Sequence, residues 1–377
     1  MTGIILIGVF AFVLVLLEEY MYARFWNRGL SVSLGFNKAS IVCGEEGELF
    51  EIIENSKFMP LSILRVKFET DRGLKFEDNI GSSTTDKFYR NDVFSIGMNE
   101  RVTRTLPFTA AKRGVYSVEN LDLIASDIFL SRQYFDTRKT DTTLYVYPKS
   151  LKSDEFRQSL KRLNGEILTK RHIIEDPFEF RGIREYQSFD SQKKINWKAS
   201  AKTGELKVIQ NNYTSLKAIR IFVDISDSGV LKKEDSQEAC LEACAGLSEF
   251  FLSEGMQVSV FCNARDIFTY ERLAIPASGG MGQMNTVLMA LSRLSLADYT
   301  DFANLKEQIL NEDTDSFTIF LSLNGYGEFT DILSEYKEKG MDFFWYYITG
   351  ERTEPEIMPS LKENLSFIHF KDITGNA

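Results

Sequence analysis

An unbroken apolar run from Ile4 to Leu17 is the first pattern along the chain. At about 1.5 Å per residue, a helix of this run covers roughly 21 Å, which is less than the ~30 Å hydrocarbon core of a bilayer. Flanking residues extend it, and four aromatic residues are expected at the headgroup level as an aromatic belt: Tyr20, Tyr22, Phe25 and Trp26. We therefore predict a single transmembrane anchor over residues 1–26.

Two other interpretations of this run are a cleaved signal peptide and a buried core helix. A signal peptide needs a basic segment before the run and a small-residue cleavage site after it, and neither pattern is present. Arg24 and Arg28 follow the run, whereas no Lys or Arg precedes it. The positive-inside tendency then predicts that the protein is in the cell membrane with its body on the cytoplasmic side.

Residues 31–148 alternate between apolar and polar positions with a period of two. Leu64, Val66 and Phe68 alternate with Arg65, Lys67 and Glu69, which buries one face of a strand and leaves the other in water. Similar short runs recur between turn signals such as Gly44-Glu45-Glu46-Gly47. This spacing predicts an antiparallel β-sandwich domain, with a structural or partner-binding role.

After residue 151 the pattern changes to fully apolar strands separated by helical stretches. Ile219–Val223 is apolar at nearly every position, and four later runs repeat that type: Val258–Cys262, Phe317–Leu323, Phe343–Ile348 and Phe367–Phe370. Alternating strands and helices predict a doubly wound α/β domain over residues 151–377. The chain is thus expected to be an α+β multidomain protein: a transmembrane helix, an antiparallel sandwich and an α/β domain.

Charge and composition exclude several function classes. The 44 basic and 54 acidic side chains give a net charge of −10, which disfavours nucleic acid as a partner. Two histidines leave little material for a zinc site or a Ser-His triad. Cys240 and Cys244 lie four apart on the apolar stripe of a predicted helix, and we interpret them as buried, inert thiols rather than as a redox or metal pair.

A segment at the start of the α/β domain carries a family resemblance. Its motif comprises Arg184-Glu185-Tyr186, Asp190, Asn196-Trp197 and Ala201, and it resembles domain-of-unknown-function family 58. Phe189 and Asn196 stand where that family usually has glycine and aspartate. The resemblance implies a von Willebrand factor type A-like fold and, as partner, a MoxR-type AAA+ ATPase.

The charged and aromatic residues of this motif allow two main roles. They can clamp the segment onto the domain through ion pairs and a buried Trp197, or they can form a surface that contacts a partner. The first role is favoured, and we predict that Trp197→Ala destabilises the α/β domain by roughly 3–5 kcal/mol, as expected for a buried aromatic residue. Catalysis by these residues is the least favoured role.

Asp224-Ile225-Ser226-Asp227-Ser228, directly after a predicted buried strand, resembles the metal-ion-dependent adhesion site of von Willebrand factor type A domains. Oxygens of Asp224, Ser226 and Ser228 could face one Mg²⁺ at the carboxyl end of the sheet. The resemblance implies two further ligands, for which Thr286 and Asn324 are the candidates. An Asn in place of Asp lowers the affinity for a cation, and the alternative is that the acidic loop only caps the next helix.

These patterns favour a membrane-anchored protein-interaction module that is not an enzyme. A degenerate metal site with Mg²⁺ as cofactor is one interpretation of its acidic loop, and helix capping alone is the other. The alternatives are a metal-dependent hydrolase that uses Asp224 and an extracellular adhesin of opposite orientation. The glycine cluster Ser278–Gly282 lacks the Lys-Ser/Thr ending of a phosphate-binding loop, so no nucleotide site is predicted.

Overall fold

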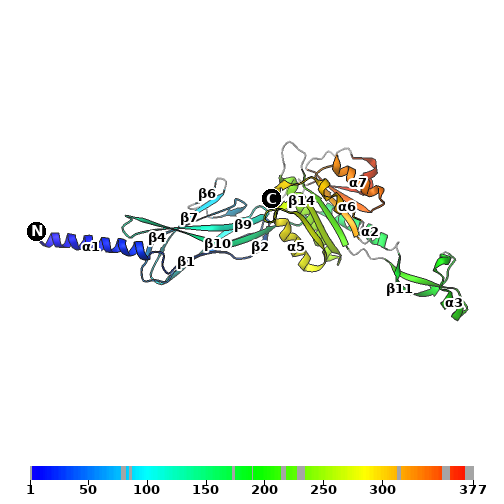
Figure 1. Ribbon diagram of the computed structural model, residues 1–377, viewed down its shortest axis with the longest axis horizontal. Helices are drawn as coiled ribbons and strands as arrows, with labels where there is room; N and C mark the ends of the chain where they lie inside the picture. Colours follow the sequence, from blue (N-terminus) through cyan, green and yellow to red (C-terminus); the bar gives the residue numbers. More distant parts are fainter. Residues whose placement is uncertain are drawn as a thin grey trace. The chain divides into compact units, whose positions relative to one another are not determined.

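The structure, a computed structural model, describes residues 2–77, 82–84, 87–171, 175–188, 190–213, 218–226, 234–311, 316–349 and 357–369. The chain divides into two compact units, Met1–Lys149 and Ser150–Ala377 (Figure 1). An N-terminal apolar helix and a β-sandwich make up the first unit, and a mostly parallel sheet with helices makes up the core of the second. The predicted fold class is confirmed.

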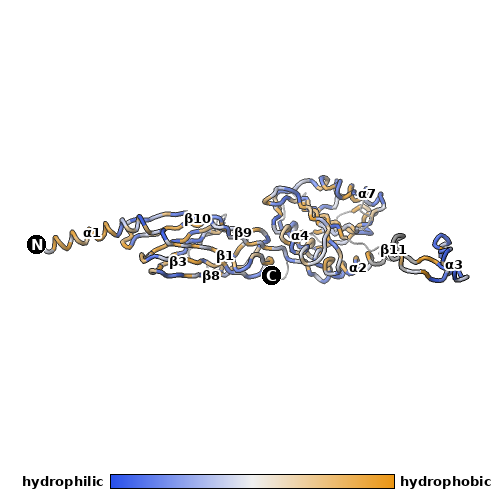
Figure 2. The backbone as a smooth tube through the Cα atoms, turned by 60° about the horizontal axis from the view of Figure 1, so that its bottom comes forward, coloured by the Kyte–Doolittle hydropathy of each residue, from blue (hydrophilic) through white to orange (hydrophobic). Residues whose placement is uncertain are grey.

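Helix α1 (Thr2–Phe25) is a continuous helix of 24 residues that is long and apolar enough to cross a membrane. Figure 2 shows its hydrophobic character along most of its length, and its apolar side chains are exposed from Ile4 to Leu17. The expected aromatic belt is wrong in two of its four members, because Tyr22 and Trp26 are buried in the core of the sandwich. The Tyr22 hydroxyl also donates a hydrogen bond to the Pro60 carbonyl (2.7 Å). The last turns of α1 are therefore part of the sandwich.

The sandwich consists of a four-stranded sheet, in the order β1-β3-β8-β5, and a six-stranded sheet, in the order β2-β10-β9-β4-β7-β6. Most pairs are antiparallel, and the short β2 pairs with β10 in parallel. Alternate side chains of these strands fill one apolar core between the sheets. The strand bounds are β1 (Leu30–Phe36), β2 (Ser40–Val42), β3 (Glu46–Asn55), β4 (Leu61–Thr70), β5 (Leu74–Phe76), β6 (Ser82–Thr84), β7 (Phe88–Ile96), β8 (Glu100–Ala110), β9 (Gly114–Ser126) and β10 (Gln133–Tyr147).

Three buried charged side chains, Glu51, Arg90 and Asp92, interrupt that core. The Asp92 carboxylate accepts from Arg90 Nε (2.6 Å) and from Arg104 Nη1 (2.6 Å), and it therefore joins β7 to β8. Glu51 is fully buried, and no group in the described part of the chain donates a hydrogen bond to its carboxyl oxygens. Burial, and next the nearby charge of Asp92, raise the pKa of Glu51 to about 8. Glu51 therefore sits in the folded sandwich mainly as a neutral acid.

The second unit is built on a sheet in the order β15-β14-β13-β17-β18-β19, with β16 paired to β14. Neighbouring strands in the order β14-β13-β17-β18-β19 are parallel. Strands β15 and β16 both pair with β14 and run antiparallel to it. Its strands are β13 (Ala218–Asp224), β14 (Gln257–Asp266), β15 (Arg272–Ser278), β16 (Leu294–Tyr299), β17 (Ser316–Ser322), β18 (Phe343–Thr349) and β19 (Leu365–His369).

Helices cover both faces of this sheet, as a doubly wound fold requires. One apolar cluster joins Ile219, Ile221 and Val223 to side chains of α2 (Asp154–Arg171), α4 (Glu234–Ser253) and α5 (Gly280–Ser292). Another cluster joins Phe222, Phe320 and Trp345 to the opposite helices. Those elements are η2 (Phe302–Leu305), α6 (Lys306–Leu310), α7 (Glu328–Glu338) and η3 (Pro359–Asn364).

The segment that carries the family motif forms a hairpin with its own two-stranded sheet, β11 (Glu175–Glu185) and β12 (Lys207–Tyr213). Between the strands lie a single 3-10 turn, η1 (Gln192–Lys194), and the short helix α3 (Trp197–Thr203). We call residues 175–213 the motif hairpin. Figure 1 shows β11 and α3 within it.

Candidate functional site

Asp224 ends β13 at the carboxyl edge of the parallel sheet, where ligand sites of such folds form. Its carboxylate is buried, with the residue only 1% exposed. Oδ1 accepts from the Ser226 amide (2.9 Å) and from Asn263 Nδ2 (2.7 Å), and Oδ2 accepts from Asn324 Nδ2 (3.4 Å). Burial raises the pKa of Asp224, and the hydrogen bonds from Ser226, Asn324 and Asn263 oppose that shift. The neighbouring polar groups thus all serve to hold this one carboxyl.

Asn263, fully buried on the adjacent strand β14, fixes the polarity of this cluster. Its Oδ1 accepts from the Ile225 backbone amide (3.0 Å), and because that amide can only donate, the orientation of the Asn263 side chain is determined. Nδ2 then faces three acceptors: Asp224 Oδ1, Ser226 Oγ (2.8 Å) and the Thr300 carbonyl (3.1 Å). Asn263 therefore presents N–H groups to the cluster, not oxygen.

Asn324 has the same polarity. Its Nδ2 donates to the Ser226 carbonyl (2.7 Å), which can only accept, as well as to Asp224. The Ser322 hydroxyl holds this turn by donating to the Asn324 carbonyl (2.6 Å) and accepting from its amide (2.8 Å). The sequence placed Asn324 at this edge of the sheet, and the structure brings it to Asp224 as a donor of hydrogen bonds.

Thr286, the other distant candidate, is not in this cluster. The edge strand β15 is antiparallel, and Ser278 at its end pairs with Val258 at the start of β14. Helix α5 therefore begins near the amino edge of the parallel strands. There, Gln283 Nε2 donates to the Val258 carbonyl (2.8 Å). Thr286 is exposed, and its hydroxyl donates to the Gly282 carbonyl of its own helix (2.9 Å).

The threonine at the carboxyl edge is Thr300 instead. Strand β16 brings the chain back along β14, and the Thr300 amide donates to the Asn263 carbonyl (2.9 Å). Sequence reasoning missed both Asn263 and Thr300. The sequence did contain a signal for Asn263, because it is a polar residue directly after the apolar run Val258–Cys262. Thr300 had no such signal, because its place depends on the direction of two edge strands.

The described donor set does not fit Mg²⁺, which needs several oxygen ligands in octahedral geometry. Asp224 is the one carboxylate of the cluster in the described residues, and two amide N–H groups point at it where a cation would need oxygens. No group of three or more His, Cys, Asp or Glu side chains that could hold a metal occurs in the described part of the chain. Ser228 and Asp227 lie outside the described residues. Within the described residues, the cluster is a hydrogen-bond network around a buried acid.

The motif hairpin is organised by a second polar network. Arg184 forms a bidentate pair with Asp190, with Nη1–Oδ2 at 2.6 Å and Nη2–Oδ1 at 2.5 Å, and Arg184 Nη1 also donates to the Glu185 carbonyl (2.9 Å). Hydrogen bonding from Arg184 is the main cause that lowers the pKa of Asp190. The same carboxylate accepts from the Gln187 amide (2.8 Å). The pair thus fixes the turn that follows β11.

Asn196 begins the short helix of the hairpin. Its Oδ1 accepts from the Ala199 amide (3.1 Å), as an N-cap residue does. The Ser200 hydroxyl donates to the Asn196 carbonyl (2.9 Å) and accepts from the Lys207 amide (2.8 Å), so it connects α3 to β12. An Asn here does the capping that the family's usual aspartate can also perform.

Glu185 and Tyr186 complete the motif at the end of β11. The Tyr186 amide donates to the Leu206 carbonyl (2.9 Å), which continues the hairpin pairing past the strand. Glu185 is exposed and lies 3.4 Å from Lys207 Nζ. Phe189 lies outside the described residues. These contacts are all internal to the hairpin.

Trp197 occupies the first position of α3 and is 68% exposed. The expectation of a buried tryptophan is therefore wrong. The polar residues of the motif satisfy one another and cap the helix, so they hold an indole in water without enclosing it. Three further apolar side chains of the hairpin are also exposed: Phe180, Ile183 and Leu206. This combination is typical of a contact surface.

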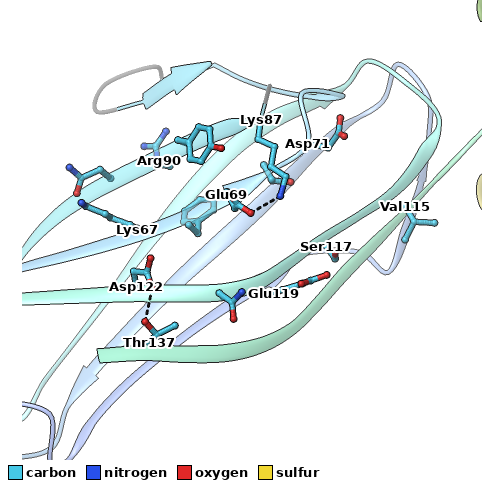
Figure 3. A pocket seen from close by; sticks show the side chains of 15 residues that line it. Lys67, Glu69, Asp71, Lys87, Arg90, Val115, Ser117, Glu119, Asp122 and Thr137 are labelled. Carbon is cyan, nitrogen blue, oxygen red and sulfur yellow. Dashed lines mark hydrogen bonds and ion pairs between the residues drawn. The ribbon is translucent and has the colours of Figure 1, made fainter. Parts of the chain in front are cut away.

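A groove of about 1000 Å³ lies on the sandwich, where Figure 3 shows the side chains that line it. Lys87 Nζ pairs with Glu69 Oε1 (2.6 Å), and the Thr137 hydroxyl donates to Asp122 Oδ1 (2.7 Å). Each pair joins neighbouring strands within the lining of the groove, with Lys87 directly before β7. Nothing in its geometry assigns it a chemistry.

Cys240 and Cys244 are fully buried in α4. Burial raises the pKa of both thiols, so neither is a ready thiolate nucleophile or ligand.

Comparison with known families identifies the stretch that contains this geometry. Residues 182–312 match the family model described as "Protein of unknown function DUF58". The resemblance is thus confirmed over this range, and the DUF58 region extends from the motif hairpin through Asp224 and Asn263 to α6. Among curated proteins, none matches this sequence.

Solved structures similar to the chain include three β-domains, none of which covers more than about a third of it. The CARDB domain of the PF1109 protein from Pyrococcus furiosus has 12% identity and a TM-score of 0.20, covering 32% of this chain and 88% of that one. A non-cellulosomal cohesin from Archaeoglobus fulgidus has 13% identity and a TM-score of 0.22, with coverage of 34% and 97%. The third cohesin of ScaC from Acetivibrio cellulolyticus has 16% identity and a TM-score of 0.22, with coverage of 31% and 98%. At this similarity they carry no information about function.

Proposed function

We propose that this protein is a membrane-anchored, non-enzymatic interaction protein that captures a protein partner through Trp197 of the motif hairpin. The observation that carries the proposal is the exposed indole on a scaffold made by the DUF58 motif itself. Tryptophan gives a large contact area for little conformational entropy and is enriched among residues that dominate binding energy. The Asn196 cap and the Arg184–Asp190 pair hold it in place before binding, which lowers the cost of association.

The family resemblance supplies the candidate partner, a MoxR-type AAA+ ATPase. We expect binding to this ATPase to need no metal, because two Asn side chains already donate hydrogen bonds to the Asp224 carboxylate. We assign that cluster a structural role, in which it joins β13, β14 and the turn after β17. In the described part of the chain, no arrangement of side chains favours the metal-dependent hydrolase or the adhesin.

Helix α1 supports the membrane part of the proposal. Its apolar side chains are exposed from Ile4 to Leu17, and it continues without a break into the sandwich core through Tyr22 and Trp26. Cleavage after the apolar run, as for a signal peptide, would separate or remove these core residues. Arg24 and Arg28 favour a cytoplasmic location for both units. A reporter fused to the carboxyl terminus that is active only outside the cytoplasm would contradict this orientation.

Direct binding of the full chain in detergent to the purified MoxR-type ATPase of the same organism tests the partner. Trp197→Ala should weaken binding by at least about tenfold, whereas Lys202→Ala, an exposed position on the same helix, should not. Affinity should be the same in Mg²⁺ and in EDTA when nucleotide is absent. Equal binding by Trp197→Ala and wild type would reject the hairpin as the contact site, and no binding by wild type would reject this partner.

A further inference from the structure

One end of the sandwich gathers the connections that surround the base of α1. Strand pairing puts the start of β1 beside the end of β3, since Leu30 pairs with Asn55, and Asn55 pairs in turn with Glu100 at the start of β8. On the other sheet, Ser126 at the end of β9 pairs with Ile63 and with Gln133. The loops Ser56–Pro60, Gly97–Asn99 and Asp127–Arg132 therefore lie at the same end. We call them the α1-end loops.

Two of these loops are bonded directly to α1 or to the turn that follows it. Glu18 Oε1 accepts from the Ile128 amide (3.0 Å), and Glu19 accepts from the Ser131 hydroxyl (3.1 Å) and pairs with Arg132 (3.3 Å). The Ser56 amide donates to the Gly29 carbonyl (2.8 Å). The remaining loop, Gly97–Asn99, is bonded to Ser56–Pro60, because the Asn99 amide donates to the Lys57 carbonyl (3.2 Å).

Each α1-end loop exposes large apolar side chains. They are Phe58 in the first loop, Met98 in the second, and Ile128, Phe129 and Leu130 in the third. Four described connections at the opposite end of the sandwich, residues 37–39, 43–45, 71–73 and 111–113, contain none of the exposed large apolar side chains. Among the described loops of the sandwich, exposed large apolar side chains gather at the end that α1 enters; Tyr89, Val93 and Phe135 are exposed on strands.

The loop Asp127–Arg132 is held by hydrogen bonds and contains a residue in the left-handed region. The Asp127 carboxylate accepts from the Ser131 amide (2.7 Å) and the Arg132 amide (3.2 Å), which closes the turn. Leu130 has a φ of +57°, a left-handed conformation that glycine adopts without cost and that costs a leucine of order 1 kcal/mol. Here the chain holds a large apolar side chain at a position where glycine would be favoured.

The position of these loops along α1 indicates what covers them. The exposed apolar run ends at Leu17, and Ile128 is bonded to the next residue, Glu18. Because the run covers only about 21 Å of the ~30 Å hydrocarbon core, the turn that contains Glu18 and Glu19 lies close to the lipid boundary. The basic side chains of Arg24, Arg28 and Arg132 are exposed around the same end, where they suit anionic headgroups.

We infer that the α1-end loops insert their apolar side chains into the headgroup region of the bilayer, so that the sandwich sits on the lipid surface as a rigid extension of the anchor. This inference rests on the proposed function in that it requires α1 to span the membrane. It goes further in assigning a lipid-binding surface to loops that carry no motif. The lipid contact restrains the tilt of the sandwich, which an anchor helix alone would leave free.

Site-specific labelling of the full chain in liposomes that contain phosphatidylcholine and phosphatidylglycerol tests this inference. Cys43→Ser leaves three fully buried cysteines, so an introduced cysteine can carry an NBD fluorophore selectively. Phe129→Cys and Phe58→Cys report on two different α1-end loops, and Lys38→Cys reports on the opposite end. We expect blue-shifted emission and several-fold stronger quenching by doxyl-labelled lipid at positions 129 and 58 than at position 38.

Carbonate extraction of the same samples separates the two ways in which the inference can fail. If the chain resists extraction but labels at 129 and 58 are as accessible to water as the label at 38, the lipid-surface inference is wrong and the anchor stands. A chain released by carbonate would overturn the anchor and the inference together. Quenching at 129 but not at 58 would contradict insertion by all three loops.

Discussion

Each of the two units buries a polar network around a carboxyl group, and the two networks differ in how they are satisfied. In the α/β unit, the buried carboxyl of Asp224 receives hydrogen bonds from a backbone amide and two Asn side chains. In the sandwich, the buried carboxyl of Glu51 has no such donor in the described residues. A buried carboxyl group can be stabilised either by surrounding it with hydrogen-bond donors or by keeping it protonated.

The exposed apolar residues of the motif hairpin and of the α1-end loops also differ in their arrangement. Trp197 stands on a hairpin whose polar residues are bonded to one another, so the motif supports a single aromatic residue. Around α1, five apolar side chains on three loops surround a helix that is itself apolar. The first arrangement suits a protein partner that encloses one side chain, and the second suits a continuous lipid surface.

The sharpest test of this comparison sets the exposed tryptophan against a buried one. Trp345→Ala should destabilise the α/β unit by about 3–5 kcal/mol, because Trp345 is fully buried between the sheet and its helices. Trp197→Ala should change the free energy of unfolding by less than about 0.5 kcal/mol. Denaturant unfolding of the full chain in detergent, followed by circular dichroism, measures both. A large loss of unfolding free energy in Trp197→Ala would mean that the indole of Trp197 is buried against the rest of the protein.

Removing a donor from the Asp224 network should have the next largest effect. Asn263→Ala leaves the Ile225 amide and the Asp224 carboxyl short of partners, and we expect a loss of about 2–4 kcal/mol in the free energy of unfolding. Thr286→Ala, outside the network, should cost less than about 0.5 kcal/mol. If Asn263→Ala and Thr286→Ala both had the free energy of unfolding of the wild type, the stabilising role of the Asp224 network would be contradicted.

The raised pKa of Glu51 predicts that the stability of the sandwich depends on pH. Between its ordinary pKa of 4.5 and its folded pKa of about 8, the folded chain keeps a proton that the unfolded chain has lost. The stability that this proton confers is complete below pH 4.5 and is lost as pH rises through about 8, at roughly 1 kcal/mol per pH unit. Glu51→Gln should flatten this slope, whereas Glu48→Gln at an exposed site of β3 should not. A wild-type stability that rises over this range would contradict the prediction.

The smallest expected effect is that of magnesium. With no oxygen-rich site in the described cluster, binding weaker than ~10 mM would add less than about 0.1 kcal/mol at 1 mM Mg²⁺. The melting temperature of the full chain should therefore be the same with Mg²⁺ and with EDTA. A clear upward shift that Asp224→Asn abolishes would restore the metal site.

Much of the fold was predictable because burial imposes a period on the sequence. The alternation at Leu64, Val66 and Phe68 and the apolar run Ile219–Val223 follow from strands with one covered face and with two. The candidate sites were less predictable. Asn324 was found from its position after a strand, but the choice of Thr286 failed because the direction of an edge strand is not encoded in its own pattern.

By itself, the sequence determined the apolar helix, the two kinds of β-structure and the DUF58 motif, because each depends on local periodicity or on residue identity. Tertiary structure alone decided that Tyr22 and Trp26 belong to the sandwich core and that Trp197 is exposed. It also decided that the amides of Asn263 and Asn324 point at Asp224. Burial and hydrogen-bond polarity depend on which distant segments pack together, and no short stretch of sequence specifies its own neighbours.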